Sequence, residues 1–121
     1  MPKVLVVDDE ENIRLLLRTV LELDDLDVLT AENGLRALEL LKKQKVDIVI
    51  TDIMMPKMDG WELMKKIRED LKSDVPIIAL TVRSDPLSEK LSREKYKVKE
   101  YITKPFDRKE LVNKVRKYIG N

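Results

Sequence analysis

Five short runs rich in β-branched and other apolar residues alternate along the chain with segments of helical periodicity, and this alternation constrains the fold most. Three of the runs are almost continuously apolar, as strands are when helices cover both faces of their sheet. Five βα units in 121 residues predict one α/β domain over residues 1–121, with a doubly wound, mainly parallel sheet and helices on both faces. The runs lie at residues 4–7, 28–31, 47–51, 76–80 and 100–102.

Helical segments are expected between these runs, because apolar residues recur there at spacings of three and four. The Asp59-Gly60 turn begins the third segment, and Asp107 with Glu110 gives a capping-box pattern at the start of the fifth. The fourth segment is mostly polar, so we expect it to be the least stable helix. The apolar residues that mark the five segments are Ile13, Leu16, Leu17 and Val20; Leu35, Leu38 and Leu41; Trp61, Leu63, Met64 and Ile67; Leu87 and Leu91; and Leu111, Val112, Val115 and Tyr118.

The composition removes several classes of function. The chain contains neither cysteine nor histidine, which excludes disulfides, thiolate metal sites and the commonest general base. Carboxylates remain as the strong metal-binding side chains. There are 24 Lys and Arg against 23 Asp and Glu, so the charge points to no nucleic-acid or membrane partner. No apolar stretch approaches the length of a transmembrane helix, and we expect a cytoplasmic protein.

Carboxylates follow two of the predicted strands. Ligands bind at the carboxyl ends of the strands in sheets of this kind. Asp8 and Asp9 follow the first run, and Asp52 follows the third. If these strands are neighbours, the three acids converge and repel each other, and a hard divalent cation such as Mg²⁺ resolves the conflict. Two other interpretations stay open: Asp8 and Asp9 as charges at a helix N-terminus, and Asp52 as an exposed loop residue.

A hydroxyl and a lysine follow the last two strands. Thr81 ends the fourth, and Lys104 follows the fifth, where Lys104-Pro105 is a plausible cis peptide. Taken singly, Thr81 is more often a strand-end cap and Lys104 a solvated side chain. Together with the three acids they form a constellation suited to a phosphoryl group and Mg²⁺, with an aspartate as the nucleophile toward phosphorus. The loop at residues 54–60 can add a backbone carbonyl to the same cation.

Four motifs in order along the chain carry a family resemblance. They are Val6-Val7-Asp8-Asp9-Glu10; Thr51-Asp52-Ile53-Met54-Met55-Pro56 with Met58-Asp59-Gly60; Leu80-Thr81; and Tyr101-Ile102-Thr103-Lys104-Pro105-Phe106. With these motifs the sequence resembles the receiver domains of bacterial two-component response regulators, including the stand-alone chemotaxis type, over the whole chain. The resemblance implies a flavodoxin-like fold with strand order 2-1-3-4-5.

The resemblance also implies a role for each matching residue. Asp52 matches the phosphoacceptor, and Lys104 matches the lysine that pairs with the phosphoryl group. Thr81 and Tyr101 match the coupled switch pair, in which the hydroxyl moves toward the phosphate and the ring turns inward. The implied Mg²⁺ ligands are Asp9 directly, Asp8 mainly through water, Asp52, and Met54 through its backbone carbonyl.

The partners follow from the same resemblance. A histidine kinase or histidine phosphotransfer protein supplies the phosphoryl group, with specificity expected on the exposed face of the first helix around Asn12, Arg14, Leu15 and Arg18. The output is a downstream target protein or an effector domain. We expect a stand-alone monomer that can dimerise when phosphorylated, and no enzyme activity beyond its own phosphorylation and dephosphorylation. The alternative is a receiver domain excised from a longer transcription factor or effector.

The sequence departs from the family pattern at two places, and two rival classes of protein compete with this family. Val82 stands where many receivers have a small residue, and residues 96–99 replace the usual Gly-Ala turn. Arg83 is hypothesised to shield the acyl phosphate from water. A phosphatase or nucleotide-binding protein is disfavoured, because the chain lacks a Gly-rich loop after the first strand and an Asp-x-Asp motif. A phosphate-independent interaction module is the other alternative, disfavoured because Asp9, Asp52 and Lys104 are all present.

Overall fold

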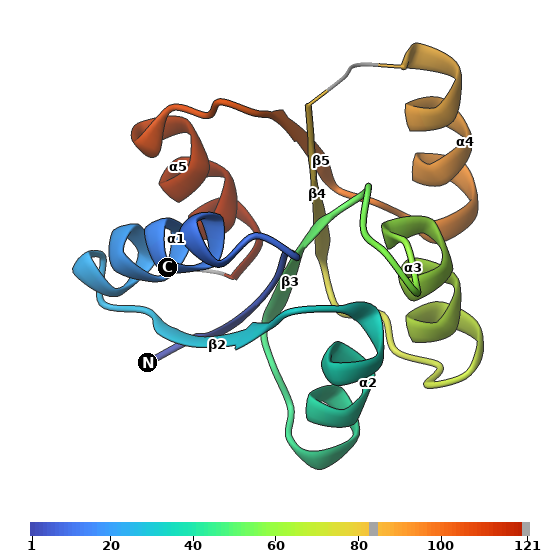
Figure 1. Ribbon diagram of the computed structural model, residues 1–121, viewed down its shortest axis with the longest axis horizontal. Coiled ribbons are helices and arrows are strands. Elements are labelled where there is room, and N and C mark those ends of the chain that lie inside the picture. Colours follow the sequence, from blue (N-terminus) through green and yellow to red (C-terminus); the bar gives the residue numbers. More distant parts are fainter. Residues whose placement is uncertain (83–84, 120–121) are drawn as a thin grey trace.

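The computed structural model describes residues 1–82 and 85–119, and within them the chain forms one parallel sheet between two layers of helices (Figure 1). The strands are β1 (Lys3–Val7), β2 (Asp27–Ala31), β3 (Ile48–Asp52), β4 (Ile77–Thr81) and β5 (Glu100–Thr103). Their order in the sheet is β2-β1-β3-β4-β5. The doubly wound sheet and its predicted strand order are thereby confirmed, and each predicted strand end lies within one residue of the observed one.

The helices divide between the two faces of the sheet. They are α1 (Glu11–Leu23), α2 (Gly34–Lys43), α3 (Gly60–Glu69), α4 (Pro86–Tyr96) and α5 (Arg108–Ile119). Helices α1 and α5 cover one face, and α2, α3 and α4 lie on the other (Figure 1). Among the described residues, none of these helices is long and apolar enough to cross a membrane.

Two apolar cores, one on each face, explain why the strand sequences are continuously hydrophobic. In β1, Leu5 and Val7 pack into the core under α2 and α3, whereas Val4 and Val6 pack into the core under α1 and α5. Successive side chains of a strand point to opposite faces, so a strand covered on both sides needs an apolar residue at every position.

Four of the apolar residues expected to mark helices are exposed: Leu16, Leu35, Leu87 and Leu91. In α1 the buried stripe is Leu17, Val20 and Leu21. This stripe follows the i, i+3, i+4 rule, and Leu16 lies just outside it and is exposed. Periodicity alone therefore placed part of the apolar face about one residue too early.

Helix α4 departs furthest from an amphipathic helix. Leu87 and Leu91 are 67% and 55% exposed, and Ser92 is the buried residue of this helix at 3% exposure. The helix ends at Tyr96, and its C-cap residue Lys97 has a left-handed backbone with φ of 57°. This low apolar burial agrees with the expectation of a weakly held helix, which stays a prediction until its stability is measured.

One arginine holds the C-terminal end of α4. Arg68 of α3 donates from Nε to the carbonyl of Tyr96 at 2.7 Å. From Nη1 it donates to the carbonyls of Ser73 at 3.0 Å and Val75 at 2.7 Å. The segment after α4, which replaces the usual Gly-Ala turn, is therefore packed in place, with Val98 buried in the core under α3.

The turn into α3 brings that helix directly against the end of β3. The N–H of Gly60 donates to the carbonyl of Ile53 at 2.8 Å, and Asp59 caps the helix by accepting from the N–H of Glu62 at 2.9 Å. A Cβ at Gly60 would lie 2.4 Å from the carbonyl oxygen of Asp52. Glycine is therefore required here by the close approach of two backbones.

Candidate functional site

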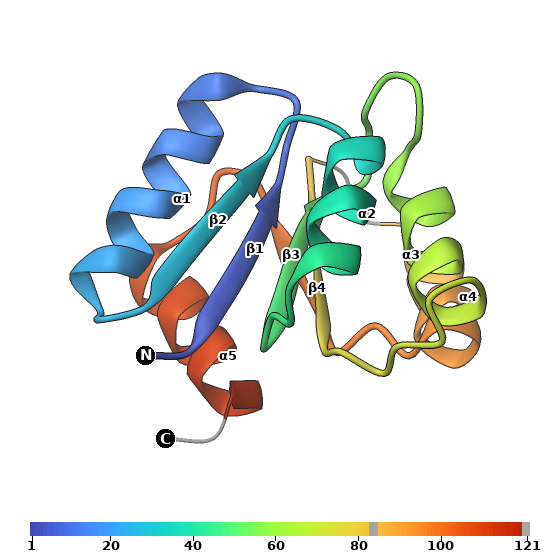
Figure 2. The same cartoon turned by 90° about the horizontal axis from the view of Figure 1, so that it is seen from below.

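The carboxyl ends of the strands bring together residues that are far apart in the sequence. Asp8 follows β1, Asp52 ends β3, Thr81 ends β4 and Lys104 follows β5. The register pairs Val7 with Thr51 and Thr81 with Thr103. Because all the strands are parallel, their carboxyl ends lie along one edge of the sheet, toward which the β1 and β2 arrows point in Figure 2. Lys104-Pro105 is a cis peptide, as expected.

Two buried carboxylates share one ammonium group at this edge. Asp8 is fully buried and Asp52 is 5% exposed. The Nζ atom of Lys104 lies 2.8 Å from Oδ2 of Asp8 and 3.4 Å from Oδ2 of Asp52. A single cation between two acids in a low-dielectric position partly offsets their repulsion. The structure therefore brings together three of the residues that the sequence placed in the site.

The backbone around Asp8 fixes the direction of its carboxylate. Its Oδ1 accepts from the N–H of Glu10 at 2.9 Å, and its Oδ2 faces Lys104. Arg14 donates from Nη1 to the carbonyl of Asp8 at 2.7 Å. Arg14 was expected on the exposed face of the first helix, and this expectation is wrong because its guanidinium reaches back to the end of β1 and is half-buried. Asn12, Leu15 and Arg18 are exposed.

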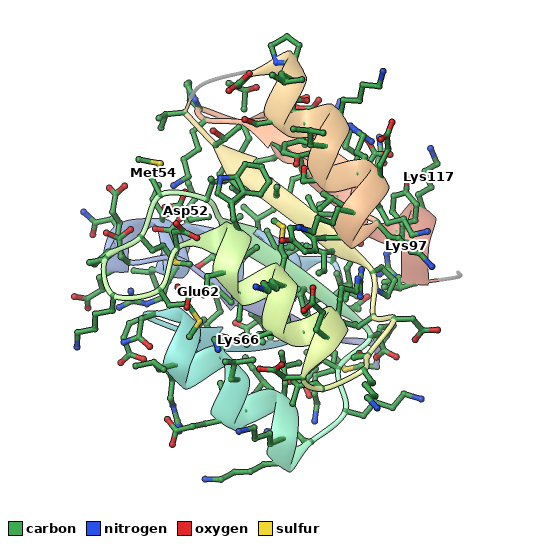
Figure 3. All side chains as sticks on the ribbon, turned by 90° about the vertical axis from the view of Figure 1, so that its right-hand side faces the viewer. Asp52, Met54, Glu62, Lys66, Lys97 and Lys117 are labelled. Atoms are coloured by element: carbon green, nitrogen blue, oxygen red, sulfur yellow. The ribbon has the colours of Figure 1, made fainter. Side chains whose placement is uncertain are left out.

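The carboxyl group of Asp52 is hard to ionise in this setting. Burial, and then the charge of Asp8, raise its pKa from 3.8 to about 6, although Lys104 and the N–H of Met54 act in the opposite direction. That N–H donates to Oδ1 of Asp52 at 3.3 Å. The Met54 side chain points away from the sheet beside Asp52 (Figure 3). A poorly solvated carboxylate that is only partly neutralised is suited to binding a further cation.

Lys104 stays positively charged in spite of its burial. Burial alone would lower its pKa, but the hydrogen bond and charge of Asp8, together with Asp52, raise the pKa above its ordinary value. Its backbone N–H donates to the carbonyl of Thr81 at 2.7 Å, which ties the β5 end to the β4 end. The ammonium is thus a fixed point charge beside Asp52, suited to phosphoryl oxygens.

Three consecutive acids can hold a metal ion beside this pair. Asp8, Asp9 and Glu10 each offer a carboxylate oxygen, and these oxygens lie within 4.8 Å of one another. Oxygen ligands of this kind fit a hard divalent cation such as Mg²⁺. Asp52 is not one of this group, and Glu10 takes a place that the sequence reasoning did not give it. Its position in an Asp-Asp-Glu run directly after a strand was the available signal.

The switch pair predicted by resemblance lines one pocket. Thr81 and Tyr101, together with Trp61 of α3, line a cavity of about 270 Å³. The Tyr101 ring lies 6.5 Å from the Trp61 ring at an interplanar angle of 44°. Burial, and then the charge of Glu89, raise the pKa of the Tyr101 hydroxyl to about 12. The phenol is therefore a hydrogen-bond donor at neutral pH.

Two neighbours of Tyr101 were not anticipated. The guanidinium carbon of Arg93 lies 5.1 Å from the ring centroid, and the hydroxyl of Tyr101 is hydrogen-bonded to the hydroxyl of Ser92. Neither contact leaves a sequence signal, because both partners are on a different element from the tyrosine. Arg83, which was hypothesised to shield an acyl phosphate, lies outside the described residues.

The strand order and the acid–lysine edge define a flavodoxin-like α/β domain with its site at the carboxyl end of the sheet. The family model for the response regulator receiver domain matches residues 4–116. The chain belongs to this family of two-component signalling domains.

Curated relatives support this membership at the level of sequence. The chain is 41% identical over 116 residues to the heme response regulator HssR of Staphylococcus aureus strain Newman, covering 96% of this chain and 50% of that protein. It is 44% identical over 114 residues to the probable transcriptional regulator ycf27 of Guillardia theta, covering 94% of this chain and 44% of that protein. The chain thus spans about half the length of the curated relatives it matches.

Solved structures agree over the whole domain. The chemotaxis protein CheY4 of Vibrio cholerae superposes with a TM-score of 0.90 at 31% identity, covering 98% of both chains. The response regulator TrrA of Thermotoga maritima, crystallised in complex with Mg²⁺-BeF, has a TM-score of 0.86 at 42% identity and covers 98% of this chain and 99% of its own. These similarities include both a chemotaxis protein and a regulator solved with a metal ion.

Proposed function

We propose that residues 1–121 form a phosphorylatable receiver domain in which Asp52 accepts a phosphoryl group from a histidine kinase or a histidine phosphotransfer protein. The observation that carries the proposal is the placement of Asp52, buried at the end of β3 with Oδ2 at 3.4 Å from the Lys104 ammonium. A carboxylate oxygen forms the bond to phosphorus, and the bond from phosphorus to the donor nitrogen breaks. The electron pair and a proton end on the leaving imidazole.

Mg²⁺ is the proposed cofactor, held by Asp8, Asp9 and Asp52 with the backbone carbonyl of Met54. The ion supplies charge neutralisation to the phosphoryl oxygens when it is bound. The raised pKa of Asp52 supports this assignment, because a second cation restores the ionised form that attacks phosphorus. The complex of TrrA with Mg²⁺-BeF supports it from a relative. Glu10 is available to orient water around the ion.

Lys104 is proposed to exchange its ion pair with the Asp52 carboxylate for an ion pair with the phosphoryl oxygens. Phosphorylation adds up to about two negative charges at Asp52. The ammonium stays bonded to Asp8 at 2.8 Å and needs only a small movement to meet the new oxygens. Through this positioning of charges the chain is proposed to catalyse its own phosphorylation and dephosphorylation.

Thr81 and Tyr101 are proposed to read the phosphorylation state. The phosphoryl group favours a conformation in which the Thr81 hydroxyl donates to it and the Tyr101 ring turns inward, a population shift between two states. The resulting change at α4, β5 and α5 is the output, read by a downstream target protein or an effector domain. The proposal holds for a stand-alone receiver and for one joined to an effector, and phosphate-dependent dimerisation distinguishes an effector-linked design.

The experiment is the intact mass of the protein after incubation with Mg²⁺ and acetyl phosphate. We expect the wild type to gain one phosphoryl group, Asp52→Asn to gain none, and EDTA to abolish the gain. Asp70→Asn is the matched control, because Asp70 is an exposed acid at the C-terminal end of α3. The same Asp-to-Asn change is thereby made away from the candidate site. No gain in the wild type, with Mg²⁺ binding intact, would contradict self-catalysed phosphorylation and favour either a receiver that requires its kinase or a phosphate-independent interaction module.

A further inference from the structure

Helix α4 turns a polar residue toward the sheet. Among the described residues of this helix only Ser92 is buried, at 3% exposure, whereas Leu87 and Leu91 face solvent. Burying a hydroxyl in place of an apolar side chain costs free energy unless the hydroxyl is bonded. The contacts of Ser92 are therefore what hold this part of the helix in place.

The two hydrogen bonds of Ser92 have a defined direction. Its Oγ lies 3.1 Å from the carbonyl of Glu89 in the preceding turn, and it is also bonded to the hydroxyl of Tyr101. A serine has one O–H to donate, and a carbonyl can only accept. Ser92 therefore donates to Glu89 and accepts from Tyr101, so the phenol of Tyr101 donates to Ser92.

Tyr101 is held on one side and has space on the other. The Ser92 bond and the Arg93 guanidinium fix the ring against α4. The cavity of about 270 Å³ that it shares with Thr81 lies beside it. A ring with one polar tether and an adjacent cavity has a second position available once the tether is lost.

We propose that Ser92 is a positioning residue that latches Tyr101 in the unphosphorylated conformation and so sets the resting population of the switch. This inference rests on the proposed function, and it adds that the Ser92 hydroxyl opposes the inward movement of the Tyr101 ring. Phosphorylation at Asp52 must outweigh the Tyr101–Ser92 bond. Removing that bond shifts the equilibrium toward the conformation that the phosphoryl group favours, before any phosphoryl group is present.

The test compares Ser92→Ala, Tyr101→Phe and the double variant with the wild type. Beryllofluoride with Mg²⁺ serves as the probe, and Trp61, the single tryptophan, reports on the neighbouring Tyr101 ring by its fluorescence. One lost hydrogen bond corresponds to a change of roughly two- to tenfold. We expect each single variant to bind beryllofluoride that much more tightly, and the double variant to match the singles because both remove the same bond.

A matched control removes a different hydroxyl from the same helix. Ser88 donates to Asp85 at 2.8 Å at the start of α4 and lines the same cavity as Tyr101, so Ser88→Ala removes a nearby hydroxyl without removing the Tyr101–Ser92 bond. We expect this control to lose some helix stability with beryllofluoride affinity unchanged. An equal gain in affinity in Ser88→Ala, or additive effects in the double variant, would overturn the latch.

The free protein separates failure of the latch from failure of the proposed function. Without any probe, the Trp61 fluorescence of Ser92→Ala and Tyr101→Phe should move away from that of the wild type, and α4 amides should exchange faster than in the wild type. If the wild type does not respond to beryllofluoride, the phosphoryl function fails, and these free-protein signals still decide the latch. Unchanged fluorescence and exchange in both variants would overturn it.

Discussion

Helices α3 and α4 lie next to each other on the same face of the sheet, yet they are held by opposite means (Figure 1). Helix α3 buries Leu63, Met64 and Ile67 and begins against the backbone of Asp52 and Ile53 at the end of β3. Within the part of the chain that the structure describes, helix α4 buries only Ser92, and its other contacts include the packing of Tyr96 against the core and the hydrogen bond from Arg68 to the Tyr96 carbonyl. We expect this difference to separate a rigid frame around Asp52 from a less stable element that can move. Elements that move in switching are drawn from the less stable parts of a fold.

The largest expected effect tests this contrast with one substitution in each helix. Leu63→Ala should lower the free energy of unfolding by about 2–5 kcal/mol, because Leu63 is fully buried and leaves a cavity. Leu91→Ala should change it by less than about 0.5 kcal/mol, because that leucine is mostly exposed. Urea unfolding measures both. Similar losses in the two variants would remove the distinction between frame and movable element.

The second prediction concerns the contact between α3 and the end of β3. Gly60→Ala should cost about 2–3 kcal/mol, because its Cβ would meet the backbone oxygen of Asp52 at 2.4 Å and backbone atoms cannot yield. Gly34→Ala is the control, since its Cβ would meet side-chain atoms of Met58, at 2.7 Å from Sδ, and not backbone atoms. Urea unfolding should show a much smaller loss for Gly34→Ala. A tolerated Gly60→Ala, with phosphorylation unimpaired, would mean that this end of the frame is adaptable.

The third prediction tests whether the buried charge of Asp52 lowers the free energy of unfolding. Burial and Asp8 raise the pKa of Asp52 to about 6, so the ionised group opposes folding at pH 7. Asp52→Asn should raise the free energy of unfolding at pH 7 in EDTA by about 1–2 kcal/mol. This figure is the net gain, from which the loss of the ion pair with Lys104 has already been subtracted.

The pH dependence of this gain has a definite sign. A carboxyl whose pKa is raised in the folded state costs stability above that pKa, and the cost disappears as the pH falls from about 6 toward 3.8. The difference between the variant and the wild type should therefore narrow between pH 7 and pH 4 in urea unfolding. Added Mg²⁺ should stabilise the wild type more than Asp52→Asn. A variant less stable than the wild type at pH 7 would contradict this prediction.

The architecture and the meeting of Asp8, Asp52 and Lys104 were predictable from the sequence because they depend on backbone topology. Continuous apolar runs separated by helical segments lead to a parallel sheet, and parallel strands end on one edge. Residues placed directly after those strands then meet whatever their separation in the sequence. Lys104 reaches Asp8 across 96 positions for this reason.

The remaining details depend on side-chain partners, and the sequence does not identify those. Consecutive leucines in α1 leave the buried stripe ambiguous, so Leu16 was predicted to be part of it. Arg14 was predicted to lie on the exposed face, whereas its guanidinium bonds the carbonyl of Asp8. Ser92 looks like any polar residue of an exposed helix until its neighbour on β5 is known. A hydroxyl or guanidinium whose partner lies on another element leaves no periodic pattern.

Arg68 has a consequence for how the chain tolerates changes of length. Its guanidinium is bonded to the carbonyls of Ser73 and Val75, in the connection between α3 and β4, and of Tyr96 at the end of α4. The segment at residues 70–76 must therefore keep its length to present two of those carbonyls. Insertions and circular permutation succeed where the backbone is exposed and free of such bonds. A reporter domain or a new terminus placed in this segment would release the end of α4 as well as the loop itself.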